Sequence, residues 1–155
     1  MIEVVKNSHN AKIYRHIENL NVLTERAIRQ AYYKVGRLIQ KESRQSIIQG
    51  PKTGRLYRIP GRKRKHRASA PGEPPANLFG NLQKSINFTV QGSKQLVIGA
   101  GDDTNVPYAR ILELGGRTKY ATIQPRPYLI RAIDDKEKDT ENIFNTEIKR
   151  TLNRL

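Results

Sequence analysis

The chain has 155 residues, of which 36% are hydrophobic and 28% charged, and it contains no cysteine. This length suits one domain that buries about two-thirds of the surface exposed by its unfolded chain. The lack of cysteine excludes disulfides, thiolate metal sites and a cysteine nucleophile. The first ten residues lack the apolar segment of a signal peptide, and no apolar run approaches the roughly 18 residues of a membrane span, so we expect cytoplasmic synthesis and no membrane partner.

Positive charge dominates the sequence, with 29 Lys and Arg against 14 Asp and Glu, a formal net charge of +15. No acidic residue stands between Glu42 and Glu73. A block of like charge repels itself and is rarely packed in a core, so this stretch must stay solvated or meet negative charge. Nine basic residues fall within it: Arg44, Lys52, Arg55, Arg58, Arg62, Lys63, Arg64, Lys65 and Arg67.

A long amphipathic helix is predicted near the N-terminus. Apolar residues recur at three- and four-residue steps from Leu23 to Ile39, and Gly50-Pro51 provides a stop. The same spacing continues upstream through residues 11–20. That segment is either the start of the same helix or a separate one, in which case Asn21 or Thr24 would cap the second.

The basic stretch itself has the alternating pattern of strands. Between Thr53 and Ala68 the side chains of Arg55, Tyr57 and Ile59 would share one face, and Pro60-Gly61 reads as a turn. The following residues, 68–76, carry three prolines and a glycine without periodicity. We therefore expect a protruding basic hairpin or loop, inserted at residues 52–76, that ends in an arm without regular structure.

The second half of the chain alternates short strands with helices. Residues 85–90 and 95–99 predict an antiparallel hairpin, and residues 107–114 predict a short helix ended by Gly115-Gly116. Residues 117–126 read as an extended connector, because Pro125 and Pro127 disfavour helix before them. One apolar stripe then runs from Pro127 to Leu155.

These elements predict an α+β fold in a single domain spanning residues 1–155. A small antiparallel β-sheet would be packed by a long N-terminal helix and a long C-terminal helix, with the basic hairpin or loop protruding. No internal repeat or change in composition marks a second domain.

Catalytic patterns are weak. The histidines His9, His16 and His66 have no metal-ligand spacing, and no glycine-rich phosphate loop is present. The pairs Asp102-Asp103 and Asp134-Asp135 fit a turn and a helix start, although a Mg²⁺-dependent nuclease would also use such carboxylates. We predict that the chain is not an enzyme and has no cofactor and no metal.

Two groups of motifs carry a resemblance to a known family. Tyr108-Ala109 is followed by Leu112-Glu113-Leu114-Gly115 and then by Pro125-Arg126-Pro127-Tyr128-Leu129. Upstream, residues 69–76 read SAPGEPPA and precede Gly80-Asn81-Leu82. Together these motifs span residues 69–133, and their order and spacing resemble the small neck and tail-completion proteins of tailed bacteriophages.

The resemblance implies a virion structural protein of the head-tail connector that assembles as a ring around the DNA channel. It implies as partners further copies of the chain, sixfold in preference to twelvefold, the adjacent portal-side and tail-tube-side proteins, and genomic DNA without sequence specificity. Arg126, held between two prolines, suits a bidentate contact to a carboxylate such as Glu113 or to a partner's acidic group. Our candidate ring-interface residues are Tyr108, Glu113, Arg126, Tyr128 and Phe144.

Three interpretations of the basic run remain open: a solvated loop, a nucleic-acid contact, or a contact to an acidic neighbouring protein. A stand-alone basic nucleic-acid-binding protein is the alternative function, although the sequence has no recognised binding module. The candidate contacts to DNA or a partner are Arg55, Arg58, Arg62, Lys63, Arg64, Lys65 and Arg67.

Overall fold

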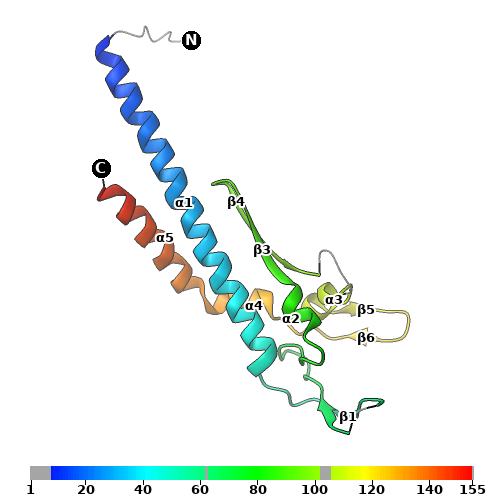
Figure 1. Cartoon of the computed structure of the whole chain (residues 1–155). Helices are drawn as coiled ribbons and strands as arrows, with labels where there is room; N and C mark the ends of the chain where they lie inside the picture. Colours follow the sequence, from blue (N-terminus) through cyan, green and yellow to red (C-terminus); the bar gives the residue numbers. More distant parts are fainter. Residues whose placement is uncertain (1–7, 62, 102–105, 155) are drawn as a thin grey trace.

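The computed structural model describes residues 8–61, 63–101 and 106–154, with side chains from residue 15 onward. Its longest element is helix α1 (Ser8–Gln49), along which the other elements are arranged (Figure 1). Residues 11–20 belong to this helix, so neither Asn21 nor Thr24 caps it. The Thr24 hydroxyl instead donates a hydrogen bond to the Leu20 carbonyl, 2.8 Å away within the helix.

Helix α1 ends where the sequence predicts. The Gly50 amide donates to the Ser46 carbonyl at 2.9 Å, and the chain then leaves the helix at Pro51. The Lys52 ammonium lies 2.8 Å from the Gly50 carbonyl and 3.5 Å from that of Ser46. A cation at this end satisfies carbonyls that lack intrahelical partners and offsets the helix dipole.

Helices α4 (Leu129–Asp135) and α5 (Glu137–Leu152) lie along one side of α1, and the hairpin of β3 (Ile86–Gln91) and β4 (Gln95–Ala100) lies on another (Figure 1). The predicted C-terminal helix is therefore divided in two at Lys136, whose φ of −111° and ψ of 15° depart from helical values. Ala132 of α4 forms a buried cluster with Val35 and Ile39 of α1, and Phe144 of α5 packs against this cluster.

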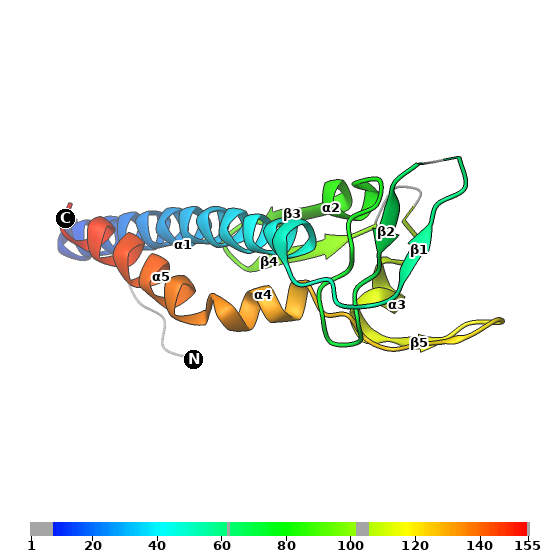
Figure 2. The ribbon, with the colours of Figure 1, turned by 90° about the horizontal axis from the view of Figure 1, so that it is seen from below.

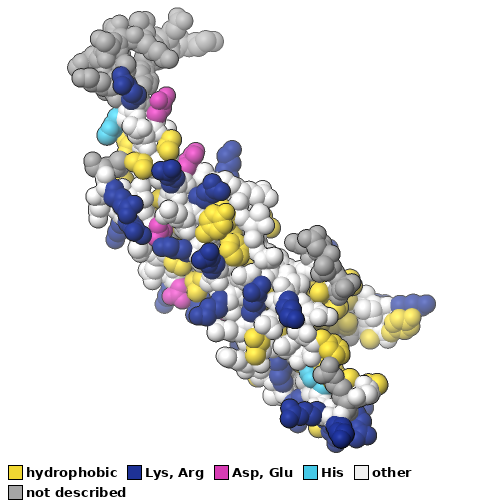
Figure 3. Space-filling model, in the orientation of Figure 1, with side chains coloured by type: hydrophobic (Ala, Val, Ile, Leu, Met, Phe, Trp, Pro, Cys, Tyr) yellow, Lys and Arg dark blue, Asp and Glu magenta, His cyan; other side chains and the backbone are white. Residues whose placement is uncertain are grey.

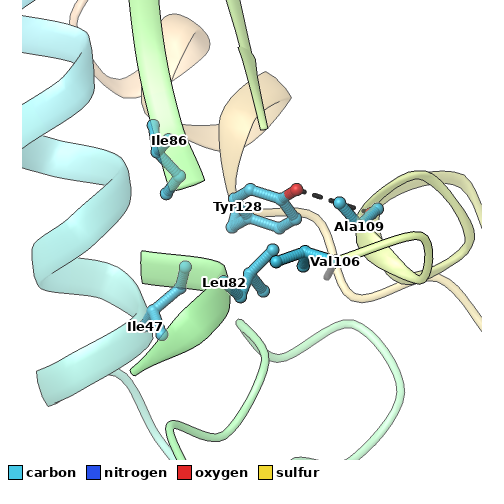
Figure 4. Close-up of a cluster of buried hydrophobic side chains, with 6 residues drawn as sticks. All are labelled: Ile47, Leu82, Ile86, Val106, Ala109 and Tyr128. Atoms are coloured by element: carbon cyan, nitrogen blue, oxygen red, sulfur yellow. Dashed lines mark hydrogen bonds between the residues drawn. The ribbon is translucent and has the colours of Figure 1, made fainter. Parts of the chain in front are cut away.

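The clusters of buried side chains follow this arrangement. Between α1, α4 and α5, the Phe144 ring meets that of Tyr32 edge to face, with centroids 5.4 Å apart. A second cluster surrounds Tyr128, which is only 1% exposed and donates from its hydroxyl to the Ala109 carbonyl at 3.4 Å (Figure 4). The other members of this second cluster are Ile47, Leu82, Ile86, Val106 and Ala109.

Within the described residues, three separate two-stranded antiparallel sheets take the place of the single small sheet that we expected. The predicted hairpins are confirmed as β1 (Leu56–Arg58) with β2 (Lys65–Arg67) and as β3 with β4. The third, β5 (Gly116–Arg117) with β6 (Thr122–Ile123), occupies the segment read as an extended connector, so that prediction is wrong there. Two short helices, α2 (Asn81–Ser85) and α3 (Ala109–Leu114), complete the fold.

Gly115 allows α3 to pass directly into the β5–β6 hairpin. Its φ is +71°, and a Cβ at this position would lie 2.9 Å from the Ile123 carbonyl oxygen and 3.0 Å from Pro125. Only glycine adopts such a backbone readily and leaves room for the returning strand. The predicted helix stop is therefore also the point where the two strands approach each other.

Phe144→Ala should lower the free energy of unfolding by about 2 kcal/mol, less than a fully buried phenylalanine would lose, because this ring is only half-buried. Urea denaturation monitored by circular dichroism would measure the loss. Ile148→Ala, on the same helix but more exposed, is the matched control and should change stability by less than about 1 kcal/mol. Equal losses for both variants would contradict the packing described for Phe144.

Candidate functional site

The carboxylate of Glu113 is the centre of the segment that carries the motifs. Its Oε2 accepts hydrogen bonds from the amides of Tyr128 at 2.9 Å and Leu129 at 3.1 Å, and its Oε1 accepts one from Ile130 at 2.8 Å. These amides open α4 and have no partner within that helix. Glu113, 8% exposed, therefore caps α4 from α3 and places a negative charge at its positive end.

Arg126 does not pair with Glu113, and that part of the prediction is wrong. The Glu113 oxygens are already occupied by backbone amides, whereas Arg126 directs its Nε toward the Ser69 carbonyl and its Nη1 toward that of Gln124, both at 3.4 Å. Its own amide donates to the Leu112 carbonyl at 2.7 Å. Arg126 therefore connects residues 69–76 to the later motif.

A second carboxylate, that of Glu73, closes the base of the basic hairpin. Glu73 accepts hydrogen bonds from the Thr53 hydroxyl at 2.5 Å, the Thr53 amide at 2.9 Å and the Ala70 amide at 2.8 Å. The Thr53 hydroxyl is the largest of the causes that lower the pKa of Glu73. The proline-rich arm has no regular secondary structure, but Glu73 within it is bonded to Thr53 on the other side of the hairpin base.

The β1–β2 hairpin separates its side chains by chemistry. Tyr57 faces His66 across the strands, with ring centroids 5.4 Å apart, and both line a groove against the body. The Leu56–Arg67 and Arg58–Lys65 pairs stand on either side of the Tyr57–His66 pair along the strands. Because successive side chains of a strand alternate between its faces, these two pairs point to the other face. One face of the hairpin is therefore aromatic and the other is basic.

The basic face is fully open to solvent. Lys and Arg side chains gather at the end of the molecule formed by this hairpin (Figure 3). None of these cations joins an ion pair in the part of the chain that the structure describes. Arg62 lies outside the described residues. The exposed basic side chains are Arg58, Lys65 and Arg67 on this face, Lys63 and Arg64 in the connection between the strands, and Arg55, which precedes β1.

The groove under the hairpin has a volume of about 400 Å³. Its lining combines side chains from both motif segments and from the hairpin, and none of the described residues that line it is acidic. Aromatic walls with a few polar groups are typical of a binding surface. The principal lining residues are Tyr57, His66, Phe79, Tyr108, Leu112 and Arg126.

The predicted interface residues fall into two groups. Tyr108 and Arg126 line the groove and are accessible there. Glu113 and Tyr128 are buried within this chain, and Phe144 packs on Tyr32. A ring contact through Glu113 or Tyr128 would require the core to open, so their roles seen here are internal.

The candidate catalytic groups do not converge. Among the described residues, no cluster of three or more His, Asp or Glu side chains could hold a metal ion. Asp134 and Asp135 are exposed on α4, and Asp102-Asp103 lie outside the described residues. No helix in the described ranges is both long and apolar enough to cross a membrane.

Sequence reasoning missed the β5–β6 hairpin and the Tyr120 side chain at its tip. Each strand is two residues long, and Lys119-Tyr120 between them lacks the Asn-Gly or Gly-Gly signal of a tight hairpin. Thr118, whose hydroxyl accepts from the Ala121 amide at 3.0 Å, is the available signal, because Thr side chains can imitate a backbone turn.

Comparison of the chain with protein-family models, curated proteins and solved structures finds no match. The resemblance to the neck and tail-completion proteins therefore stays a prediction made from the motifs.

Glu113→Gln should lower the free energy of unfolding by roughly 2 kcal/mol, because the neutral amide has one accepting oxygen for three backbone donors and no charge at the start of α4. Urea denaturation would measure the change. Glu141→Gln, an exposed position on α5, removes the same charge and should be nearly neutral. A neutral Glu113→Gln would contradict the capping role.

Acid should release the arm from the hairpin base. Because the pKa of Glu73 is lowered in the folded chain, its contribution is complete above the ordinary value of 4.5 and is lost as the pH falls through the folded value. The Thr53 and Ala70 amide proton shifts should titrate together with a midpoint below 4.5. In Glu73→Gln this titration should disappear; its persistence would assign it to another group.

Proposed function

We propose that this chain is a structural protein of a phage particle, a neck or tail-completion subunit that assembles with further copies as a ring at the head-tail junction. The observation that carries the proposal is the basic face of the β1–β2 hairpin, which is exposed at one end of an elongated molecule (Figure 3). In such a ring each copy would present this face either to the DNA channel or to an adjacent ring.

The surrounding structure supports a fixed position for the basic face. Glu73 closes the base of the hairpin, and the Gly72 amide donates to the Pro125 carbonyl at 2.9 Å. The two segments on which the family resemblance depends are thus in direct contact, and the first of them is bonded to the base of the hairpin through Glu73 and Thr53. A charged surface supported in this way is suited to a partner that has a defined place in an assembly.

The charge of the hairpin defines the chemistry of its partner. Cations without neighbouring carboxylates attract phosphates independently of base sequence, and they also attract acidic protein surfaces. Genomic DNA in the lumen and an acidic face of the portal-side or tail-tube-side protein both fit. The same face favours a second candidate, a stand-alone nucleic-acid-binding protein, which would act as a monomer or dimer.

Oligomeric state separates the two candidates. Under the first proposal, the purified chain should form closed rings, with and without duplex DNA, in native mass spectrometry and negative-stain electron microscopy. In purified particles the protein should lie on the axis between head and tail. A chain that stays monomeric and binds DNA tightly at low salt would favour the second candidate.

Replacing Lys63, Arg64 and Lys65 with serine should leave the melting temperature within about 2 °C of the original, because these side chains are exposed. If the face binds DNA, affinity should fall and log Kd should depend less steeply on log salt, by up to about 0.9 for each phosphate that the variant no longer neutralises. Fluorescence anisotropy with a duplex oligonucleotide across a salt series would measure both quantities.

The matched control replaces Lys138, Lys149 and Arg150 of α5, which are also exposed, with serine. This variant removes the same net charge and should retain most of the affinity. Genome retention in particles carrying the hairpin variant would report a DNA contact, and head-tail joining would report a protein contact. Normal particles and an unchanged salt dependence would leave the hairpin a solvated loop.

A further inference from the structure

The β5–β6 hairpin presents a tyrosine on a rigid turn. The hairpin extends away from the body of the molecule (Figure 2), and at its end the Thr118 amide and hydroxyl both donate to the Ala121 carbonyl at 2.8 Å. The Thr118 hydroxyl also accepts from the amides of Tyr120 and Ala121. Tyr120 is 89% exposed, the highest value for a large hydrophobic side chain among the described residues.

Such a turn has the properties of an anchor for a partner. A tyrosine has few rotatable bonds and a large amphipathic ring, so ordering it on binding loses little conformational entropy. The hydrogen bonds of Thr118 hold the turn in one geometry before any contact forms. Within its own chain the ring has a neighbour in Lys119, whose ammonium lies 5.7 Å from the ring centroid, and it otherwise faces solvent.

The groove under the β1–β2 hairpin is complementary to this tip. It has aromatic walls that include Tyr57 and Phe79, a volume of about 400 Å³, and the polar side chains of His66 and Arg126. A buried tyrosine needs apolar contact for its ring and a hydrogen-bond partner for its hydroxyl, and this groove offers both. Tyr120 does not line the groove of its own chain.

We propose that the Tyr120 turn of one copy of this chain seats in the groove of the next copy. The contact joins two different surfaces of identical chains, and such a head-to-tail contact closes into a ring when the rotation per subunit permits. This inference rests on the proposed function and deepens it, because it names the surfaces that join one subunit to the next.

The small area of one contact means that only a closed ring would be stable. One tyrosine buries about 150–250 Å², whereas a stable pair needs about 800 Å² on each partner. A single contact between the Tyr120 turn, which we call the finger, and the groove is therefore weak. A ring is stable because each subunit is held on two sides. Assembly should be cooperative, with few open intermediates.

Charge gives the contact a distinctive salt dependence. Lys119 beside the tip and Arg126 in the groove carry the same sign, and each copy has a net charge of +15. Screening by salt weakens this repulsion, so self-association should strengthen as the salt concentration rises. Binding to nucleic acid changes in the opposite direction, which separates the two processes.

Two single substitutions disable the two surfaces separately. Tyr120→Ser removes the anchor, and Phe79→Ser alters the groove at a side chain that is 57% exposed. Tyr57→Ser is a second groove variant, and Leu152→Ser is a matched control at an exposed apolar position away from both surfaces. Melting temperatures within about 3 °C of the original would show that each variant folds.

Native mass spectrometry and analytical ultracentrifugation of the full chain across a protein series at about 0.1 M and about 0.5 M salt would test the contact. We expect the original chain and Leu152→Ser to form rings. Tyr120→Ser or Phe79→Ser alone should need a protein concentration at least about tenfold higher to form rings, which is the effect of removing one anchor residue. A mixture of Tyr120→Ser with Phe79→Ser retains one intact finger and one intact groove per pair. It should give no rings, and because a single contact is weak it should form dimers only at the highest protein concentrations.

The outcomes separate this inference from the proposed function. Rings formed by Tyr120→Ser at the original concentrations would overturn the finger-to-groove contact and leave the ring proposal standing. Full rings from the mixed variants would also overturn it, since the mixture lacks half of the finger-to-groove pairs. An original chain that is monomeric at every salt and protein concentration, with and without duplex DNA, would overturn the ring proposal itself.

Discussion

The cap that Glu113 forms on α4 is the contact on which the arrangement of this molecule depends. One carboxylate from α3 satisfies three backbone amides fifteen to seventeen residues later in the chain, and the intervening segment forms the β5–β6 hairpin. The cap fixes Tyr128 in the core, and its hydroxyl returns to Ala109 in α3. Both ends of α3, the start of α4 and the base of the projecting hairpin are thereby held together.

The molecule separates scaffold from contact surface. The residues that carry the family resemblance mostly build the junction: Glu113, Glu73 and Tyr128 satisfy backbone groups or fill the core. The exposed surfaces that we propose as contacts for partners are the basic face of β1–β2, the groove beneath it and the tip at Tyr120. A rigid junction that holds several exposed surfaces in fixed relation suits an assembly protein, in which recognition depends on shape and charge.

Local patterns predicted the elements whose causes are local. The periodicity from Leu23 to Ile39 predicted α1, the alternation around Tyr57 predicted the β1–β2 hairpin, and Gly50-Pro51 ended the first helix. The stripe did not predict the division of the last helix at Lys136, because the apolar residues keep a helical spacing on both sides of the break. The Lys136 ammonium lies 3.6 Å from Glu42 of α1 and 3.5 Å from Asp139.

The sequence by itself determined that a basic stretch must avoid the core, because like charges cannot be buried without partners. It also determined which residues carry the resemblance. Only the tertiary structure decided that Glu113 binds backbone amides and not Arg126, that the two motifs meet at Gly72 and Pro125, and that Tyr120 is bare while Tyr128 is buried. These outcomes depend on which groups distant segments bring within hydrogen-bond distance, and spacing along the chain carries no information about that distance.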